Sequence, residues 1–172
     1  DYSPLEVEQR RTRPGFVAVA QKGNLDFIVM VVHFKATSRF DETPEKLEQS
    51  RILRSRQSEI TVAWIDSILK AKNEQDVVVL GDFNDSPLRK KYNTMGAFLS
   101  YPDVLFLTDN LKSCKYPKAY GIDHIVVTRS LLNRYVQNST KVFDTFSMFK
   151  REDAERISDH CLVFVRFDIT KP

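Results

Sequence analysis

Two apolar runs near the start of the chain predict a pair of strands. Residues 16–20 read FVAVA and residues 25–34 read LDFIVMVVHF, and the tetrapeptide QKGN separates them. β-Branched and aromatic residues favour strands, and a short connection that contains glycine favours a hairpin. The second run is apolar at nearly every position, so we expect other elements to cover both of its faces.

The stretch from residue 43 to residue 75 predicts one long amphipathic helix. Thr43 is a residue type that caps helix N-termini, and Pro44 suits the first helical position, where a missing N–H group costs nothing. Apolar residues then recur at intervals of seven, four and four residues, at Leu53, Ile60, Trp64 and Ile68. This spacing places them on one face of a helix.

Shorter apolar runs complete the expected secondary structure. Strands are predicted at residues 77–80, 123–128, 141–146 and 161–169. The chain shows no repeats, low-complexity tracts or linkers, so residues 1–172 are expected to form a single domain. A strand, a crossing helix and another strand predict an α/β (α+β) fold in which helices cover a mixed sheet.

Composition narrows the class of protein. The 172 residues are 42% hydrophobic, and no run approaches the roughly 18 consecutive apolar residues of a membrane helix. The net charge of +3 and the pI near 8.8 are compatible with a phosphate-bearing partner. Cys114 and Cys161 are too few for a disulfide scaffold, and we expect them to be reduced, packed thiols rather than a bridge.

Polar side chains gather at the ends of the predicted strands. Each of the three histidines borders an apolar run, and four carboxylate or amide residues do the same: His33, His124, His160, Asp82, Asn84, Asp123 and Asp159. In open α/β sheets, ligands bind beyond strand ends, where side chains converge without disrupting the packed layers. We therefore expect several of these residues to share one site.

Simpler interpretations exist for each motif taken alone. The segment GDFND at 81–85 could be a turn in which Gly81 adopts a positive φ and the polar side chains bond the backbone. A calcium loop that starts at Asp82 needs glycine at its sixth position and glutamate at its twelfth, where this chain has Pro87 and Asn93. The two Asp-His pairs could be surface residues, but their repetition in one small domain favours a site.

This combination of side chains suits the hydrolysis of phosphoesters. A carboxylate beside a histidine orients the imidazole and stabilises its protonated form. Oxygen ligands without a cysteine or histidine cage favour Mg²⁺, Mn²⁺ or Ca²⁺ over zinc, and such an ion neutralises charge on phosphoryl and leaving oxygens. Basic residues that could hold a phosphate, or could be ordinary solvated charges, are Arg11, Arg13, Lys35 and Arg51.

Four motifs in order along the chain resemble one enzyme family. They are VVHFKA (31–36), VVVLGDFND (77–85), GIDHIVVT (121–128) and ISDHCLVFV (157–165), with the predicted long helix between the first two. Together they are similar to the endonuclease/exonuclease/phosphatase family, which includes deoxyribonuclease I and exonuclease III. The resemblance implies a four-layered sandwich of two mixed β-sheets flanked by helices, with the site at one end of the sheets.

The resemblance also implies roles for the oxygen-bearing residues. Asp82 and Asn84 would contact the scissile phosphate and help to activate water or bind a second metal ion, and Asp159 would be a metal ligand. The implied step is in-line attack of water on phosphorus. Mg²⁺ or Mn²⁺ would stabilise the departing oxyanion, and Ca²⁺ is a further candidate.

The histidines receive different roles from the same resemblance. His160 would act at the phosphate with Asp123 orienting it, and His33 would be the second catalytic histidine. His124 has no catalytic counterpart in the family, so it is expected to be structural. Some nucleases of the family pair the first histidine with a glutamate, and this chain has Arg13 in the stretch where that partner is sought.

DNA is the expected substrate, because the RTRPGFVAVA segment and the paired histidines resemble deoxyribonuclease-like members of the family. A phosphatase or phosphodiesterase that acts on inositol phosphates or sphingomyelin is the alternative enzyme, since a fold does not fix a substrate. The family's glutamate metal ligand would precede Asp1, so the chain is expected to be the C-terminal portion of such a domain. A catalytically incomplete binding fragment is therefore the third interpretation.

Overall fold

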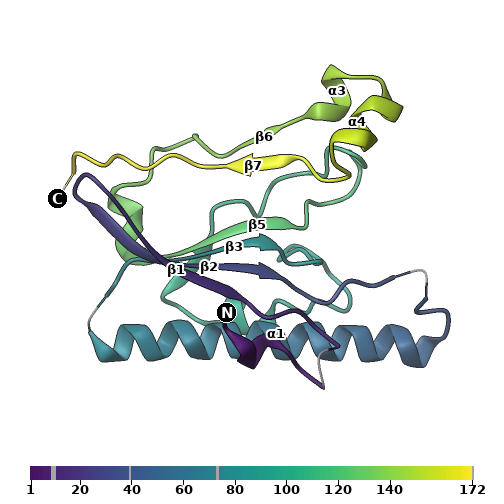
Figure 1. Ribbon diagram of the computed structural model, residues 1–172, viewed down its shortest axis with the longest axis horizontal. Helices are drawn as coiled ribbons and strands as arrows, with labels where there is room; N and C mark the ends of the chain where they lie inside the picture. The colour runs from purple at the N-terminus through teal and green to yellow at the C-terminus, as the bar shows by residue number, and fades with distance from the viewer. Residues whose placement is uncertain (9–10, 39, 73, 172) are drawn as a thin grey trace.

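A five-stranded sheet lies at the centre of the molecule (Figure 1). The computed structural model describes residues 1–8, 11–38, 40–72 and 74–171. The strands, in their order across the sheet, are β1 (Phe16–Lys22), β2 (Leu25–His33), β3 (Val77–Asp82), β5 (Asp123–Thr128) and β4 (Val104–Phe106). Strands β2 and β3 pair in parallel, and the other neighbours pair antiparallel. The sheet is therefore mixed, and the predicted hairpin of β1 and β2 is confirmed.

One long helix covers one face of this sheet, as Figure 1 shows. Helix α1 (Pro44–Ala71) begins after Thr43, whose side-chain oxygen accepts a hydrogen bond from the Lys46 amide at 3.3 Å. The helix ends before Lys72, which adopts a left-handed conformation with a φ of 58°. The predicted start is confirmed, whereas the predicted end at residue 75 is too late, and residue 73 lies outside the described residues. This crossover allows β2 and β3 to run parallel.

Alternation along β2 divides the core into two layers. Met30 and Val32 belong to a buried cluster that includes Trp64 of α1. Val29 belongs to a second cluster on the opposite face of the sheet, together with Val163 of the second sheet. Successive side chains of a strand point to opposite faces, so a strand that is apolar throughout joins both layers. The expectation that both faces of this run are covered is confirmed.

The second sheet consists of two short antiparallel strands, β6 (Lys141–Phe143) and β7 (Leu162–Phe164). Both strands are shorter than the predicted runs. The next residue, Asp144, instead caps a helix, because its carboxylate accepts a hydrogen bond from the Ser147 amide at 3.1 Å. The cross-strand partners Phe143 and Leu162 are 46% and 66% exposed, so this sheet presents an open outer face.

Short helices occupy the connections between strands. They are η1 (Ser3–Leu5), α2 (Gly96–Ser100), η2 (Arg129–Asn133), α3 (Thr145–Met148) and α4 (Arg151–Ile157). Figure 1 shows α3 and α4 at one end of the second sheet, on the side where β2 and β3 also end. The expected α/β architecture of two sheets with flanking helices is confirmed, but the second sheet, which was expected to be mixed, is antiparallel. In the described parts of the chain, no helix has the length and apolar character needed to cross a bilayer.

His124 is enclosed in the core, as its expected structural role requires. The side chain is 1% exposed, and its ring meets the rings of Phe83 and Phe106 edge-on. Nε2 donates a hydrogen bond to the Asp85 carbonyl at 3.0 Å, and Nδ1 accepts one from the Thr108 hydroxyl at 3.0 Å. Burial lowers the pKa of His124 to about 4, so the ring is held neutral.

We expect His124 to make the fold sensitive to acid. Because its pKa is about 4 in the folded chain and near 6.5 in the unfolded chain, its stabilising effect is complete above pH 6.5 and decreases as the pH falls toward 4. The expected loss in the free energy of unfolding is about 3 kcal/mol. Urea denaturation at several pH values measures it, with His124→Asn as the control. An equally steep pH dependence in that variant contradicts the assignment.

Candidate active site

Strand register brings three of the predicted site residues into one row. His33 at the end of β2 lies opposite Asp82 at the end of β3, and Asp82 lies opposite Asp123 at the start of β5. Gly81, directly before Asp82, has a φ of 136°. A Cβ atom at Gly81 would collide with the carbonyl oxygen of Val32, so the close approach of β2 and β3 at this position requires glycine.

The segment after β3 holds the Asp82 carboxylate in place. The backbone amide and the side-chain amide of Asn84 donate hydrogen bonds to the two oxygens of Asp82, at 2.8 and 2.9 Å. The side-chain amide also donates to the Phe34 carbonyl at 3.0 Å, which ties this turn to the end of β2. Asn84 adopts a left-handed φ of 53°, a conformation that asparagine tolerates well. The turn interpretation of GDFND therefore holds together with a position at the site.

His160 and Asp123 form the tightest pair in the site. His160 Nδ1 lies 2.9 and 2.8 Å from the two carboxylate oxygens of Asp123 and donates to them. Burial alone would lower the pKa of His160, but the hydrogen bond and the charge of Asp123 outweigh it, and the pKa lies above its ordinary value. The pKa of Asp123 is raised by burial, and His160 partly opposes that shift. His160 Nε2 faces Asp82 Oδ2 at 4.0 Å.

His33 has a different partner, and its pKa is shifted in the other direction. The Arg13 guanidinium, which has only donors, lies 2.7 Å from His33 Nδ1, so Nδ1 accepts and the neutral ring carries its proton on Nε2. Nε2 lies 3.5 Å from Asp82 Oδ2. Burial lowers the pKa of His33, Asp82 opposes this shift, and the charge of Arg13 adds to the lowering. The pKa values of the two histidines are therefore shifted in opposite directions.

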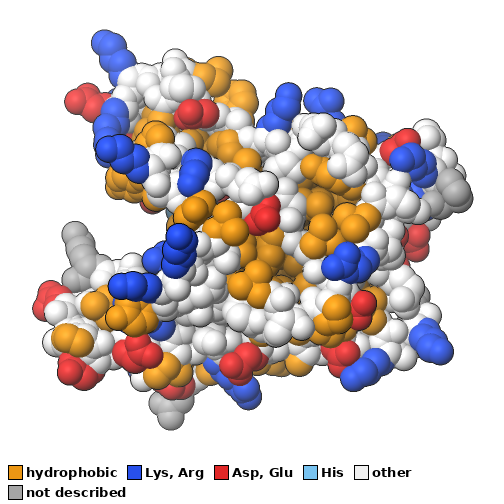
Figure 2. Space-filling view, turned by 180° about the vertical axis from the view of Figure 1, so that it is seen from behind, with side chains coloured by type: hydrophobic (Ala, Val, Ile, Leu, Met, Phe, Trp, Pro, Cys, Tyr) orange, Lys and Arg blue, Asp and Glu red, His pale blue; other side chains and the backbone are white. Residues whose placement is uncertain are grey.

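A single open hollow of about 560 Å³ joins these side chains. Its lining comprises all six predicted catalytic or metal-binding residues and two small neighbours: His33, Asp82, Asn84, Asp123, Asp159, His160, Ala36 and Ser158. The lining draws on the ends of β2 and β3, the start of β5 and the segment between α4 and β7. Seen from behind in Figure 2, the surface has a deep notch between the body of the molecule and a projecting lobe.

None of the predicted phosphate-binding cations Arg13, Lys35 and Arg51 belongs to the described lining of the hollow. Arg13 contacts His33, which does line it. Lys35 Nζ donates to the Ala36 carbonyl at 2.7 Å. The Arg51 guanidinium stacks 3.9 Å above the Tyr92 ring.

The oxygen donors suit a hard divalent ion. Asp82, Asn84 and Asp159 supply carboxylate and amide oxygens to one hollow, and Mg²⁺ is commonly held by one or two carboxylates, waters and a substrate phosphate. Among the described residues, three other potential metal ligands lie within 4.8 Å of one another: the sulfur atoms of Cys114 and Cys161 and a carboxylate oxygen of Asp144. The two cysteines of that group are already bonded to each other.

A disulfide joins Cys114 to Cys161, so the expectation of two reduced thiols is wrong. The bridge ties the loop before β5 to the residue that follows His160. A sequence separation of 47 residues gives no sign of proximity, and only the packing of the second sheet on the first brings the two Cα atoms to 6.3 Å. The segment that carries Asp159 and His160 is thereby anchored at one end.

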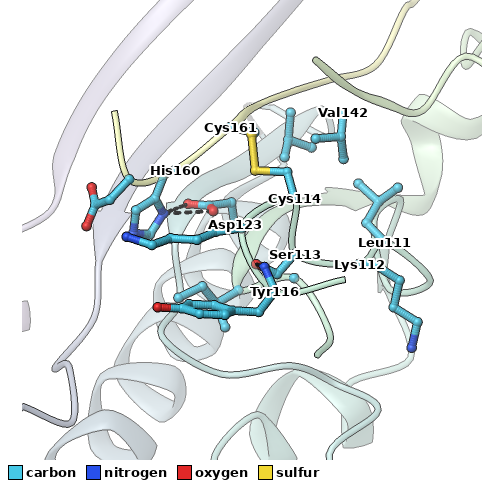
Figure 3. A pocket seen from close by; sticks show the side chains of 14 residues that line it. Leu111, Lys112, Ser113, Cys114, Tyr116, Asp123, Val142, His160 and Cys161 are labelled. Atoms are coloured by element: carbon cyan, nitrogen blue, oxygen red, sulfur yellow. Dashed lines mark hydrogen bonds and ion pairs between the residues drawn. A yellow bond between two sulfur atoms is a disulfide. The ribbon is translucent and has the colours of Figure 1, made fainter. Parts of the chain in front are cut away.

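The loop before β5 adds a second hollow that the sequence analysis did not assign. Figure 3 shows it with Asp123 and His160 on one side, Tyr116 below them and the disulfide above. The segment KYPKAY at 115–120 interleaves tyrosines with lysines, a pattern associated with nucleic-acid binding, and it directly precedes the GIDH motif. That pattern is the signal that could have identified this loop.

Comparison with known proteins gives the fold. No family model matches the sequence, and no curated protein matches it. Among solved structures, it is similar to the 3′ phosphatase NExo from Neisseria bound to a product DNA hairpin, with a TM-score of 0.59 and 17% identity over 98% of this chain and 69% of that one. Beta toxin from Staphylococcus aureus matches with a TM-score of 0.52 and 14% identity, over 88% of this chain and 56% of that one. Mannosyl-6-phosphatase Bt3783 from Bacteroides thetaiotaomicron matches with a TM-score of 0.50 and 17% identity, over 83% of this chain and 51% of that one.

These similarities support the endonuclease/exonuclease/phosphatase resemblance at the level of the fold. The architecture is consistent with the deoxyribonuclease I-like fold that the four motifs led us to expect. The chain spans between about half and about two thirds of the chains it resembles, 51% to 69% of their length. Identities of 14% to 17% indicate a shared fold, and a shared fold does not identify the substrate of this chain.

The disulfide is expected to stabilise the fold that carries the site. Replacing Cys114 and Cys161 by serine should lower the free energy of unfolding by about 2–4 kcal/mol, because the bridge restricts the unfolded chain. Urea denaturation of the double variant measures the loss. Wild-type protein treated with dithiothreitol should then unfold at the same urea concentration as the variant. Equal midpoints for oxidised and reduced wild type would show that the bridge contributes nothing.

Proposed function

We propose that this chain carries the hydrolytic site of a metal-dependent phosphodiesterase, with DNA as the favoured substrate. The observation that supports the proposal is the convergence of two histidines, one beside a guanidinium and one beside a carboxylate, on a hollow lined by oxygen donors. Phosphoester hydrolysis needs a base for water, charge stabilisation at phosphorus and a donor for the developing oxyanion. The hollow offers a candidate for each of these tasks.

His160 is the candidate base. In its neutral form, Nδ1 donates to Asp123 and Nε2 is free to accept the proton of an attacking water molecule. As the oxygen of that water bonds to phosphorus, the bond from phosphorus to the leaving oxygen breaks, and Asp123 stabilises the imidazolium that forms. The pairing with Asp123 fixes both the tautomer and the orientation of the ring.

His33 is the candidate donor. Since Arg13 occupies Nδ1, the Nε2–H group is directed into the hollow and can donate a hydrogen bond to a phosphoryl oxygen. Asp159, with Asp82 and the amide oxygen of Asn84, would hold Mg²⁺ or Mn²⁺, and Ca²⁺ has the same ligand preference. Such an ion supplies positive charge for the phosphoryl and leaving oxygens.

A second candidate is the hydrolysis of phosphomonoesters at the same site. It is favoured by the names of two structurally similar proteins, the 3′ phosphatase NExo and a mannosyl-6-phosphatase. The chemistry of attack on phosphorus is shared, so the two candidates differ in what leaves. Cleavage of an internal phosphodiester leaves a strand end, whereas a phosphatase releases inorganic phosphate.

We expect the protein to nick supercoiled plasmid with Mg²⁺ or Mn²⁺ and to be inactive with a chelator. His160→Ala and Asp123→Asn should each reduce the rate about 100-fold or more, because they remove the base or its orienting partner. Glu59→Gln, on the exposed surface of α1, is the matched control for loss of a carboxylate and should leave the rate unchanged.

The same preparations, assayed on a 3′-phosphorylated oligonucleotide, separate the two candidates. Release of inorganic phosphate without nicking favours the phosphatase. Activity that survives the chelator, or a His160→Ala variant as active as wild type, contradicts both. Inactivity of wild type on both substrates would favour the incomplete binding fragment instead.

A further inference from the structure

The loop between β4 and β5 is an ordered hairpin rather than a loose connection. The Ser113 amide donates to the Ala119 carbonyl at 3.1 Å, and the Gly121 amide donates to the Leu111 carbonyl at 2.9 Å. Cys114, at the outer part of this hairpin, is bonded to Cys161. Backbone pairing at the base and a covalent bond near the tip hold residues 111–121 against the site.

Tyr116 projects from this hairpin between two hollows. One hollow, of about 180 Å³, is lined by Asp123 and His160 as well as by Tyr116, and Figure 3 shows the tyrosine ring across from both. The other, of about 450 Å³, is lined by Tyr116, Ile122 and the segment that follows GDFND. Tyr116 is 57% exposed, a high value for an aromatic side chain beside a concave surface. Its ring is therefore placed to contact whatever extends from a phosphate at His160.

The hollow of about 450 Å³ has basic side chains in its lining. These are Arg89 and Lys90, and the described lining contains no carboxylate, although Arg89 Nε pairs with the buried carboxylate of Asp85 behind it. The Lys112 ammonium lies 3.5 Å from the centre of the Tyr120 ring, so that ring is already paired with a cation. The Tyr116 ring is less committed, because Lys115 lies 5.9 Å away and forms an ion pair with Glu155 at 3.2 Å. The surface beside the site thus combines an available aromatic ring with the positive charge of Lys90.

We propose that Tyr116 is a stacking platform for an unpaired nucleobase of the substrate strand, next to the phosphate that is attacked. The phosphate on the far side of that base would be attracted by Lys90 and Arg89. This assignment rests on the proposed function, since it places the attacked phosphate at His160. Aromatic rings and a basic groove are the features by which proteins hold single-stranded nucleic acid with little sequence preference.

The proposal has a consequence for the form of the substrate. A base that is paired and stacked in a duplex has no free face for Tyr116, so the platform favours single-stranded, frayed or looped segments. An acidic or uncharged apolar ligand would not explain both the exposed ring and the two cations. The expected ligand is therefore an oligonucleotide with accessible bases.

Equilibrium binding without metal tests the platform apart from catalysis. Fluorescence anisotropy in the presence of a chelator compares a short oligothymidylate with an abasic strand of equal length and charge. We expect wild type to bind the base-bearing strand about fivefold to 100-fold more tightly. Tyr116→Leu should abolish this preference and leave binding of the abasic strand unchanged, whereas Tyr116→Phe should retain the preference.

Two control variants sharpen the comparison. Tyr92→Leu removes another exposed tyrosine with a cation above its ring, which lines none of the hollows at the site, and should behave as wild type. Lys90→Ala should weaken both strands equally, because it removes charge and no stacking surface. A wild type that binds both strands equally, or a Tyr116→Leu variant that keeps the preference, overturns the proposal.

The outcome is separable from that of the proposed function. A base preference that depends on Tyr116, in a protein that cleaves nothing when metal is added, supports the platform and contradicts hydrolysis. Cleavage by a protein that binds both strands equally supports hydrolysis and contradicts the platform. Sedimentation with sphingomyelin vesicles that is lost in Tyr116→Leu, with no difference between the two strands, would assign the ring to a lipid surface and overturn the nucleobase proposal.

Discussion

The pairing of β2 with β3 and of β3 with β5 is the constraint on which the site depends. This register sets His33, Asp82 and Asp123 side by side. A shift of one residue in either pairing would turn these side chains to the opposite face of the sheet, because side chains alternate along a strand. The packing on both faces fixes the register, and Gly81 permits the backbones of β2 and β3 to approach closely in that register. The hydrophobic core is therefore also the device that aligns the polar residues.

Two histidines share the hollow but differ in their partners, and this difference organises the chemistry. A guanidinium at His33 disfavours the imidazolium, whereas a carboxylate at His160 favours it. The Asp82 carboxylate lies between the two rings, 3.5 Å from one and 4.0 Å from the other. Environments that push the pKa values of two titratable groups apart are the usual basis for assigning separate acid and base tasks.

Local signals were sufficient for much of the fold and for the six residues that line the hollow. The cap at Thr43, the glycine turn before β2 and the apolar run of β3 are short-range features, and each produced the expected element. Long-range contacts were different. The disulfide joins residues that are 47 positions apart in sequence, and nothing in their local patterns indicates the neighbour. Charge alone could not show whether Lys35 and Arg51 lie at the hollow, since the position of a cation depends on the backbone that carries it.

The hairpin at residues 111–121 is joined to the rest of the chain in a way that separates recognition from reaction. The strand ends supply the groups placed for hydrolysis, whereas the hairpin closes on itself between Leu111 and Gly121 and contributes the exposed ring. The hairpin sequence can therefore diverge while the row of His33, Asp82 and Asp123 stays intact. Exchange of this one segment, with the cysteine retained as its anchor, is a route by which a designer or natural selection could redirect the same reactive centre to a different substrate.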